Sequence, residues 1–299
     1  MQLIDEPRTA LSAGVDTPAP VQRAAAEPPL TVVEGRSTWN LSDVKEVWRF
    51  RELMYFLTLR DIKLRYKQTI LGVGWSVFQP LATVLVFAVF IGVMGKVADG
   101  IDNYTMFVVC GVLPWTYFAN ATTNAANSLV GNERLVTKTY FPRILLPASN
   151  VGAATFDFFI AAMLLTIWLL IDGPPPTWRL ILVPFLIGLI ALIAFGFGTF
   201  LSGLIATQRD FRYLLTFGMQ LWMFATPCIY LPPQNLGPTA QTWLPLNPVY
   251  GLILNLRNAV LGDEIQWFPL LISSTFGVLI TAFALVYFRR IENTMADTI

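Results

Sequence analysis

Six long stretches of the sequence contain almost no charged residues, and they constrain the fold more than any other feature. They lie near residues 71–95, 104–130, 144–171, 179–206, 213–231 and 267–288. An apolar helix of about 20 residues crosses the hydrocarbon core of a bilayer. The runs therefore predict an all-α, polytopic membrane protein with six transmembrane helices. The fifth run is short and contains Pro227, which predicts a break near its end. Five spans is the alternative count.

The composition points the same way. Hydrophobic residues make up 55% of the chain and charged residues only 13%, which is too apolar for a soluble domain to bury in one core. Histidine, the commonest metal ligand, is absent. Cys110 and Cys228 lie far apart in apolar runs, without the spacing of a disulfide framework or a metal site. We therefore expect no metal in this chain.

Basic residues alternate between the loops. Arginine and lysine cluster before the first run and after the second, fourth and sixth, whereas the other loops hold only Lys96, Arg179 and Arg257. Loops rich in these residues stay on the cytoplasmic side of a membrane. Both termini are therefore predicted to be cytoplasmic, which requires an even number of spans and favours six.

The segments outside the runs complete a provisional domain map. Residues 1–40 are rich in proline, alanine and charge and lack an apolar run of signal-peptide length, which predicts a disordered cytoplasmic tail. We expect residues 41–68 to form an amphipathic interface helix, residues 69–290 the six-helix transmembrane domain, and residues 291–299 a cytoplasmic C-terminal tail.

The interface helix is predicted from its periodicity. Apolar and basic side chains fall on different faces at helical spacing, which is typical of a helix lying in the membrane surface. The apolar face holds Trp48, Tyr55, Leu59, Ile62 and Tyr66, and the basic face holds Arg60, Lys63 and Lys67. A solvated basic stretch that only anchors the topology is the alternative interpretation.

The region 231–266 follows the fifth run on the external side. It opens with proline, glycine and asparagine, and then has about a dozen apolar residues around 249–261. Such a segment is too short to span the membrane, so we expect a re-entrant or interfacial helix. Asn247 and Pro248 should start this helix and Gly262 should end it.

One ionisable residue, Asp157, lies inside a predicted span. A charge within a membrane is costly, so it is expected to face the bundle interior or water and to have a partner or a function. It either lines a wet pathway or makes a structural hydrogen bond to a neighbouring helix. In the next span the small residues Gly196, Gly198, Ser202 and Gly203 predict close helix packing.

Several aromatic residues lie deep within the predicted spans. As a set, their rings are candidates to line a conduit, because flat apolar rings pack against the C–H faces of sugars. Packing against lipid is the alternative for each one alone. The set contains Phe78, Tyr117, Phe118, Phe156, Trp222 and Phe224, with Asp157 as its polar member.

Catalytic motifs are missing from the sequence. It has no G-x-x-x-x-G-K-[ST] phosphate loop, so ATP is not bound by that device. A nucleophile elbow and a zinc-binding HExxH motif are also absent. An enzyme acting on its own is therefore disfavoured.

An ordered set of segments carries a family resemblance over roughly residues 45–290. In chain order they are LRDIKLRYKQTILGVGWSVFQPL, GVLPWTYFANA, NERLVTKTYFPRILLP, QRDFRY, ATPCIY and LNPVYGLILNLRNAVLG. Together they resemble permeases of type-two ABC exporters that move O-antigen, capsule or teichoic-acid polymers, most closely the Wzm-type O-antigen permeases.

The resemblance implies a multi-pass protein of the bacterial inner (plasma) membrane. It implies a homodimeric permease that binds two copies of a separate ATPase subunit, which holds ATP and Mg²⁺, while this chain has no cofactor of its own. The implied cargo is a polyprenyl-diphosphate-linked polysaccharide, exported from the cytoplasmic to the periplasmic side. Membrane lipid is the remaining expected partner, and no nucleic acid is expected.

The resemblance also implies roles for particular residues. The ATPase-coupling segment would comprise Asn132, Glu133, Arg134, Leu135, Lys138 and Tyr140. Arg60, Lys63, Arg65 and Lys67 are candidates to attract the lipid diphosphate, although positive-inside anchoring explains the same residues. Asn247, Pro248 and Tyr250 would belong to an external gate.

Three rival functions stay open at this level. A secondary transporter or channel would use Asp157 for coupling. The second rival is an ABC exporter of a different lipid-linked or small-molecule cargo. A membrane-embedded glycan-modifying enzyme would need clustered acidic residues, and the sequence offers only isolated ones such as Asp210 and the pair Asp263 and Glu264.

Overall fold

The computed structural model describes residues 45, 47–67, 72, 74–87, 89, 103–230 and 243–292. All of them belong to a single unit, Arg36–Ile299. Within these ranges every regular element is a helix, which confirms the predicted all-α class. The expected N-terminal tail 1–40, Lys96, the first part of the external region (231–242) and residues 293–299 lie outside the described residues.

The helices follow the predicted apolar runs closely. In chain order they are α2 (Arg51–Tyr66), α3 (Gly74–Phe87), α4 (Tyr104–Gly131), α5 (Glu133–Lys138), α6 (Leu145–Asp172), the 3₁₀ helix η3 (Trp178–Leu182), α7 (Val183–Thr207), α8 (Phe211–Ala225), the 3₁₀ helix η4 (Leu244–Leu246), α10 (Tyr250–Leu261) and α11 (Trp267–Glu292).

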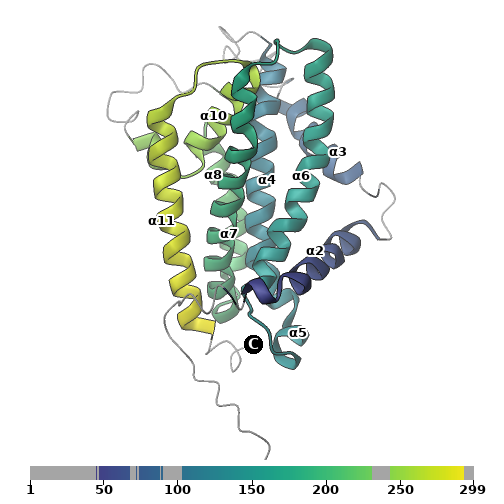
Figure 1. The fold of residues 1–299 in the computed structure, drawn as a ribbon, viewed down its shortest axis with the longest axis vertical. Coiled ribbons are helices and arrows are strands. Elements are labelled where there is room, and N and C mark those ends of the chain that lie inside the picture. The colour runs from purple at the N-terminus through teal and green to yellow at the C-terminus, as the bar shows by residue number, and fades with distance from the viewer. Residues whose placement is uncertain are drawn as a thin grey trace, which may run out of the picture. The chain divides into compact units, whose positions relative to one another are not determined.

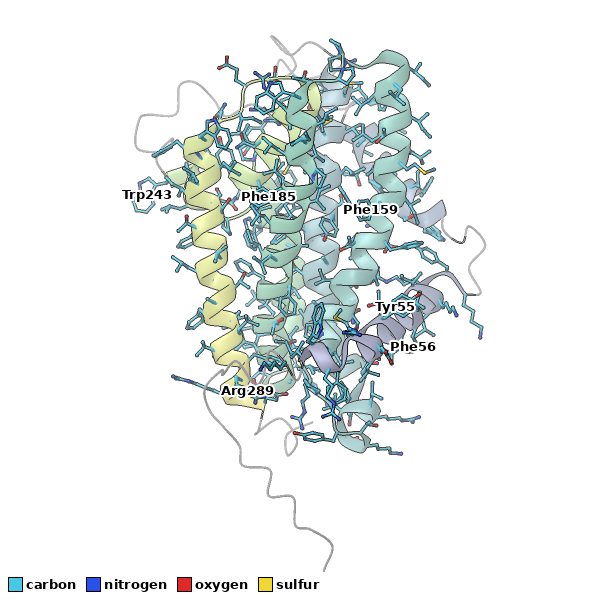
Figure 2. The ribbon with its side chains drawn as sticks, viewed as in Figure 1. Tyr55, Phe56, Phe159, Phe185, Trp243 and Arg289 are labelled. Atoms are coloured by element: carbon cyan, nitrogen blue, oxygen red, sulfur yellow. The ribbon has the colours of Figure 1, made fainter. Side chains whose placement is uncertain are left out.

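Three segments among the described residues are long and apolar enough to cross a membrane: Leu145–Ile171, Trp178–Thr207 and Trp267–Glu292. The bundle around them exposes many large apolar side chains, and Figure 2 shows Phe159 and Phe185 on its outside. Such a surface suits lipid better than water. The chain is thus a polytopic membrane protein, while the count of six spans stays a prediction.

Helix α4 is the centre of the bundle. Its side chains are buried along nearly the whole helix, and it packs most extensively against α7 and α6 (Figure 1). The helix begins after Asn103, whose side chain accepts a hydrogen bond from the backbone N–H of Met106. This side-chain cap satisfies one backbone donor that the first turn leaves free.

Small residues allow α7 to approach two neighbours, as the sequence predicted. Gly196, Gly198, Ser202 and Gly203 are all buried. A Cβ atom at Gly198 would overlap Ala125 of α4, and one at Gly196 would overlap Thr281 of α11. Backbone contacts this close are typical of helix packing within membranes.

The two ends of the bundle differ. Helix α2 packs across α6 at the same end as α5, and α10 lies near the opposite end (Figure 1). We call these the α5 end and the α10 end. A separate apolar cluster at the α5 end joins α2, α5, α6 and α11 through Leu57, Val136, Leu145 and Phe288. The α5 end is therefore a packed layer and not a set of loose loops.

Candidate functional site

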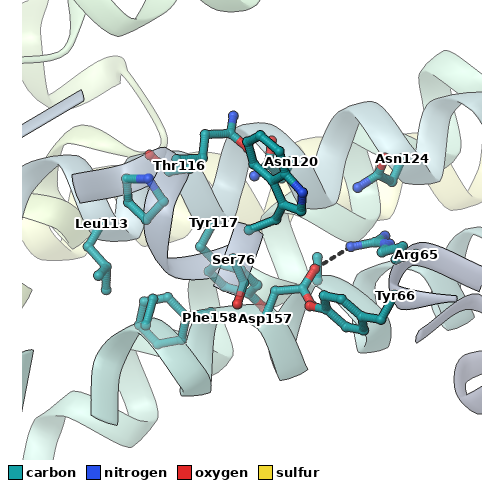
Figure 3. Close-up of a pocket in the computed structure, with 15 residues that line it drawn as sticks. Arg65, Tyr66, Ser76, Leu113, Thr116, Tyr117, Asn120, Asn124, Asp157 and Phe158 are labelled. Atoms are coloured by element: carbon teal, nitrogen blue, oxygen red, sulfur yellow. Dashed lines mark hydrogen bonds and ion pairs between the residues drawn. The ribbon is translucent and has the colours of Figure 1, made fainter. Parts of the chain in front are cut away.

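A polar cavity of 370 Å³ lies between the C-terminal end of α2 and helices α3, α4 and α6 (Figure 3). Each of these helices supplies hydrogen-bonding side chains to it. Gln79 comes from α3, Asn120 and Asn124 from α4, Asp157 from α6, and Arg65 from α2. Amides and hydroxyls both donate and accept hydrogen bonds, so the cavity suits a hydroxyl-rich ligand better than an apolar one.

Asp157 is paired with the end of α2. Arg65 Nη1 forms an ion pair with Asp157 Oδ2, and the Tyr66 hydroxyl donates a hydrogen bond to Asp157 Oδ1. About a quarter of each charged side chain is exposed, 26% for Arg65 and 23% for Asp157. The carboxylate thus bonds a neighbouring helix and also lines this cavity, while its place on a wet pathway stays a prediction.

The Tyr66 phenol stays protonated at physiological pH. Partial burial, reinforced by the hydrogen bond to Asp157, raises the pKa of Tyr66 from its ordinary value of 10.0 to about 12. A neutral phenol is a donor, whereas a phenolate beside a carboxylate would repel it. Tyr66 therefore remains a donor to Asp157 over the whole physiological range.

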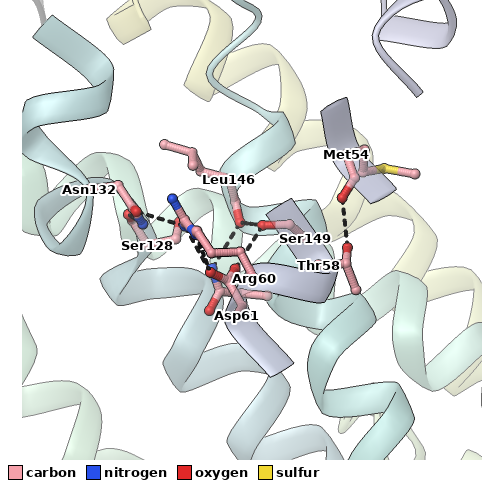
Figure 4. A network of polar contacts seen from close by, with 9 residues as sticks. Met54, Thr58, Arg60, Asp61, Ser128, Asn132, Leu146 and Ser149 are labelled. Carbon is pink, nitrogen blue, oxygen red and sulfur yellow. Dashed lines mark hydrogen bonds and ion pairs between the residues drawn. The ribbon is translucent and has the colours of Figure 1, made fainter. Parts of the chain in front are cut away.

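The four basic residues of the predicted diphosphate site are not equivalent. Lys63 and Lys67 are exposed, while Arg65 pairs with Asp157. Arg60 points elsewhere and belongs to a network at the α5 end (Figure 4). The structure therefore does not bring the four side chains together as one cluster.

The Arg60 network links α2 to the start of α5. Arg60 Nη2 lies 2.8 Å from Asp61 Oδ1 and 2.8 Å from Asn132 Oδ1. Asn132 in turn donates a 2.8 Å bond to the Ser128 carbonyl, and Ser149 of α6 donates a 3.1 Å bond to Asp61 Oδ2. One guanidinium thus ties α2, α6 and the junction between α4 and α5 together.

Helix α5 and the residues just after it present charged and aromatic side chains to the outside. Val136 is buried and Leu135 is partly buried, and together they anchor the helix in the apolar cluster of the α5 end. The exposed members of the predicted coupling segment are Glu133, Arg134, Lys138 and Tyr140. The segment forms a short helix, and its exposed residues include an arginine and a tyrosine, residue types that are enriched in protein interfaces.

The predicted conduit aromatics separate into three groups. Tyr117 lines the cavity, and its hydroxyl lies 2.8 Å from Thr155 Oγ1. Phe118 and Trp222 pack on each other within the core, with ring centroids 5.3 Å apart. The remaining three, Phe78, Phe156 and Phe224, are exposed on the outside of the chain.

At the α10 end, Asn247 holds the predicted gate segment in place. Its Oδ1 accepts a 3.1 Å bond from the Trp222 indole, and its Nδ2 donates a 2.8 Å bond to Thr226 Oγ1. Its carbonyl accepts from Ser273 of α11. Tyr250 begins α10 and is largely buried, and α10 ends before Gly262 at a left-handed φ of 87°, as predicted.

Sequence reasoning missed several polar members of the cavity, namely Ser76, Gln79, Thr116, Asn120 and Asn124. A signal for the last two was present, because amides four residues apart share one face of a helix in an otherwise apolar span. No comparable signal marked Gln79 or Ser76, since only the fold brings α3 against α4 and α6.

The structure combines apolar helices that can cross a membrane with a polar cavity between helices and a short helix exposed at one end. This combination suits a membrane transport permease. Comparison with known families makes the class specific. Residues 52–261, most of the chain, match the family described as ABC-2 type transporter. The chain therefore belongs to the ABC-2 type transporter family.

Curated relatives of the chain are export proteins. The O-antigen export system permease protein RfbA of Klebsiella pneumoniae is 28% identical over 251 residues, which cover 82% of this chain and 94% of the relative. RfbA of Myxococcus xanthus is 28% identical, covering 72% and 82%. The capsule polysaccharide export inner-membrane protein BexB of Haemophilus influenzae is 26% identical, covering 70% and 79%.

Proposed function

We propose that this chain is the transmembrane subunit of an ATP-driven exporter. Its cargo is a polyprenyl-diphosphate-linked, O-antigen-like polysaccharide, moved from the cytoplasmic to the periplasmic side of the inner membrane. The observation that carries the proposal is the similarity to RfbA, which extends over 94% of that permease. The α5 end is cytoplasmic in this assignment, and both termini lie on that side.

The energy source is a separate ATPase subunit. Two copies bind a homodimer of this chain, and they hold the ATP and Mg²⁺. Their contact is α5 with the residues that follow it, and the exposed charged side chains of α5 and the exposed Tyr140 support this assignment. The permease itself catalyses no reaction.

Helix α2 transmits the movement of α5 to the polar cavity. It carries Arg60, which bonds Asn132 beside α5, and Arg65, which bonds Asp157 in the cavity. Both arginines belong to one continuous helix, Arg51–Tyr66, so a displacement of one moves the other. ATP-driven motion at α5 therefore changes the Arg65–Asp157 pair.

The basic side chains of α2 attract the diphosphate of the carrier lipid from the inner leaflet. Lys63 and Lys67 are exposed on the last turns of the helix, and Arg65 is partly exposed beside them. A diphosphate offers several anionic oxygens, which makes it a strong partner for guanidinium and ammonium groups. Arg60 contributes to the coupling network and not to this attraction.

The test uses cells that make the lipid-linked glycan with and without this chain. Spheroplasts are labelled with an impermeant lectin, and total lipid-linked glycan is measured in extracts. We expect the deletion strain to keep the lipid-linked glycan in extracts but to lose the surface label. Expression of the chain from a plasmid should restore the surface label. Surface label that persists in the deletion contradicts export, and loss of the glycan from the extracts points to a role in synthesis.

A further inference from the structure

A second cavity, of 420 Å³, lies at the α10 end and takes no part in the site described above. Its walls are the start of α4, one side of α10 and the segment 263–266 that leads into α11. Most of the α4 and α10 side chains that line it are buried, so the cavity has a fixed shape. The lining comprises Phe107, Tyr250, Leu254, Arg257, Asn258 and residues 263–266.

Arg257 is a buried cation in the wall of this cavity, with only 2% of its surface exposed. Its guanidinium carbon lies 3.8 Å from the centroid of the Phe107 ring, in cation–π geometry. Among the described residues its one hydrogen bond is a long 3.5 Å contact from Nη1 to the Pro227 carbonyl. A guanidinium has five N–H donors, and the part of the chain that the structure describes leaves most of them without a hydrogen bond.

The walls of the cavity are held by hydrogen bonds. Asn258 Nδ2 donates to the Glu264 carbonyl at 2.9 Å. Asn255 donates to the Gln266 carbonyl at 3.1 Å and accepts from the Gln266 backbone N–H at 2.7 Å. These bonds tie the segment 263–266 to α10. The cavity is thus formed before any ligand binds, which lowers the entropy cost of binding.

The lining mixes fixed donors with fixed acceptors. Arg257 can only donate, whereas the carboxylates of Asp263 and Glu264 accept and are exposed at the rim. Exposed Gln266 can do both. An anionic ligand would meet two like charges, and a cationic ligand would meet Arg257. Sugar hydroxyls, which donate and accept at once, match this set.

We propose that this cavity binds a neutral sugar unit of the exported polysaccharide. The inference rests on the proposed function, which supplies the glycan, and it adds a binding subsite at the α10 end. The Asp263 and Glu264 carboxylates accept hydrogen bonds from sugar hydroxyls, and Arg257 donates to a sugar oxygen. The Tyr250 ring offers an apolar surface beside them.

The test measures binding of simple glycosides to the full chain in nanodiscs by saturation-transfer NMR. The probes are methyl α-glucopyranoside and its uronic acid counterpart. We expect the neutral glycoside to bind and Asp263→Asn to weaken it about tenfold, because a hydrogen bond to a charged group is lost. Asp210→Asn is the matched control, since Asp210 is an exposed aspartate that lies outside this cavity.

Each outcome decides the inference. Weaker binding in Asp263→Asn but not in Asp210→Asn supports it, and Arg257→Gln should have the same effect provided that the variant is folded by circular dichroism. Equal binding in both aspartate variants, no binding, or tighter binding of the uronic acid overturns it. The binding measurement does not depend on export. Loss of the proposed sugar site would therefore leave the spheroplast result unchanged, and a negative spheroplast result would leave the binding result unchanged.

Discussion

At the residue scale, Asp157 is the residue whose surroundings say most about the site. A single carboxylate in an apolar span is costly, and the structure meets that cost with the Arg65 guanidinium and the Tyr66 hydroxyl. Both partners come from α2, some ninety positions earlier in the chain. The carboxylate is therefore a fixed attachment point for the interface helix as well as part of the cavity.

The Arg65–Asp157 pair should couple α2 to α6 energetically. A double-mutant cycle with Arg65→Gln and Asp157→Asn, measured by thermal unfolding in nanodiscs, should give an interaction energy of about 1 kcal/mol, because each side chain is only partly exposed. The double variant should lose less stability than the sum of the losses in the two single variants. Strict additivity would show that the pair contributes nothing to holding α2.

Tyr66 gives the contact a dependence on alkaline pH. Its pKa is raised in the folded chain from 10.0 to about 12, so the folded state favours the neutral phenol. The stability from this group is therefore complete below pH 10 and is lost as the pH rises towards 12. We expect the melting temperatures of wild type and Tyr66→Phe to differ most below pH 10 and to converge above it. A constant difference would mean that the phenol does not titrate with this shift.

At the element scale, helix α2 is bonded to the rest of the bundle at two points. Arg60 bonds Asn132 at the α4–α5 junction, and Arg65 bonds Asp157 in the cavity. The helix also lies close to α6: a Cβ atom added at Gly152 of α6 would lie 3.2 Å from the Thr58 methyl carbon. A rigid helix fixed at both points connects α5 to the cavity without any flexible loop between them.

Loss of Arg60 should loosen α5 selectively. In Arg60→Gln the bond to Asn132 is weakened and Asp61 loses its charged partner, so amide exchange in 132–138 should become about tenfold faster, as expected when a hydrogen bond from a charged group is lost. Arg49→Gln, at an exposed position before α2, is the control and should leave exchange unchanged. Equal protection of 132–138 in both variants would remove Arg60 from the coupling path.

Element boundaries were predictable where the chain carries local signals. Gly262, with its positive φ, ends α10 as predicted, because only glycine adopts this conformation without strain. Helix α8 ends at Ala225, just before Thr226 and Pro227, so the fifth run is broken near its end, as Pro227 indicated. Proline lacks a backbone N–H and clashes with the preceding turn, so it outweighed the apolar run.

The contacts of the site were less predictable because they join distant segments. The sequence singled out Asp157 and Arg65 separately, as a conduit residue and a diphosphate ligand, and nothing local indicated that they pair. In the sequence, Arg257 was counted only among the few basic residues of the external loops, which served to predict the membrane orientation. Its burial against Phe107 depends on how α10 packs on α4, which no local pattern encodes.

At the scale of the whole molecule, one helix serves both cavities. Helix α4 contributes Phe107 to the cavity at the α10 end, and it contributes Asn120 and Asn124 to the cavity beside α2. A rise of 1.5 Å per residue separates Phe107 from Asn120 by about 20 Å along the helix axis. The two polar cavities thus border the central helix at different depths.

The α5 end offers the surface through which an ATPase subunit would act on the permease, and Tyr140, just after α5, is an exposed aromatic residue there, with 74% of its surface accessible. Aromatic anchors dominate protein interfaces, so Tyr140→Ala should weaken binding of the purified ATPase subunit to the permease in nanodiscs about tenfold or more. Trp178→Ala, which removes an equally exposed ring outside the α5 segment, should not change the affinity. Parallel loss in both variants would indicate a general defect, and full affinity in Tyr140→Ala would place the ATPase contact elsewhere.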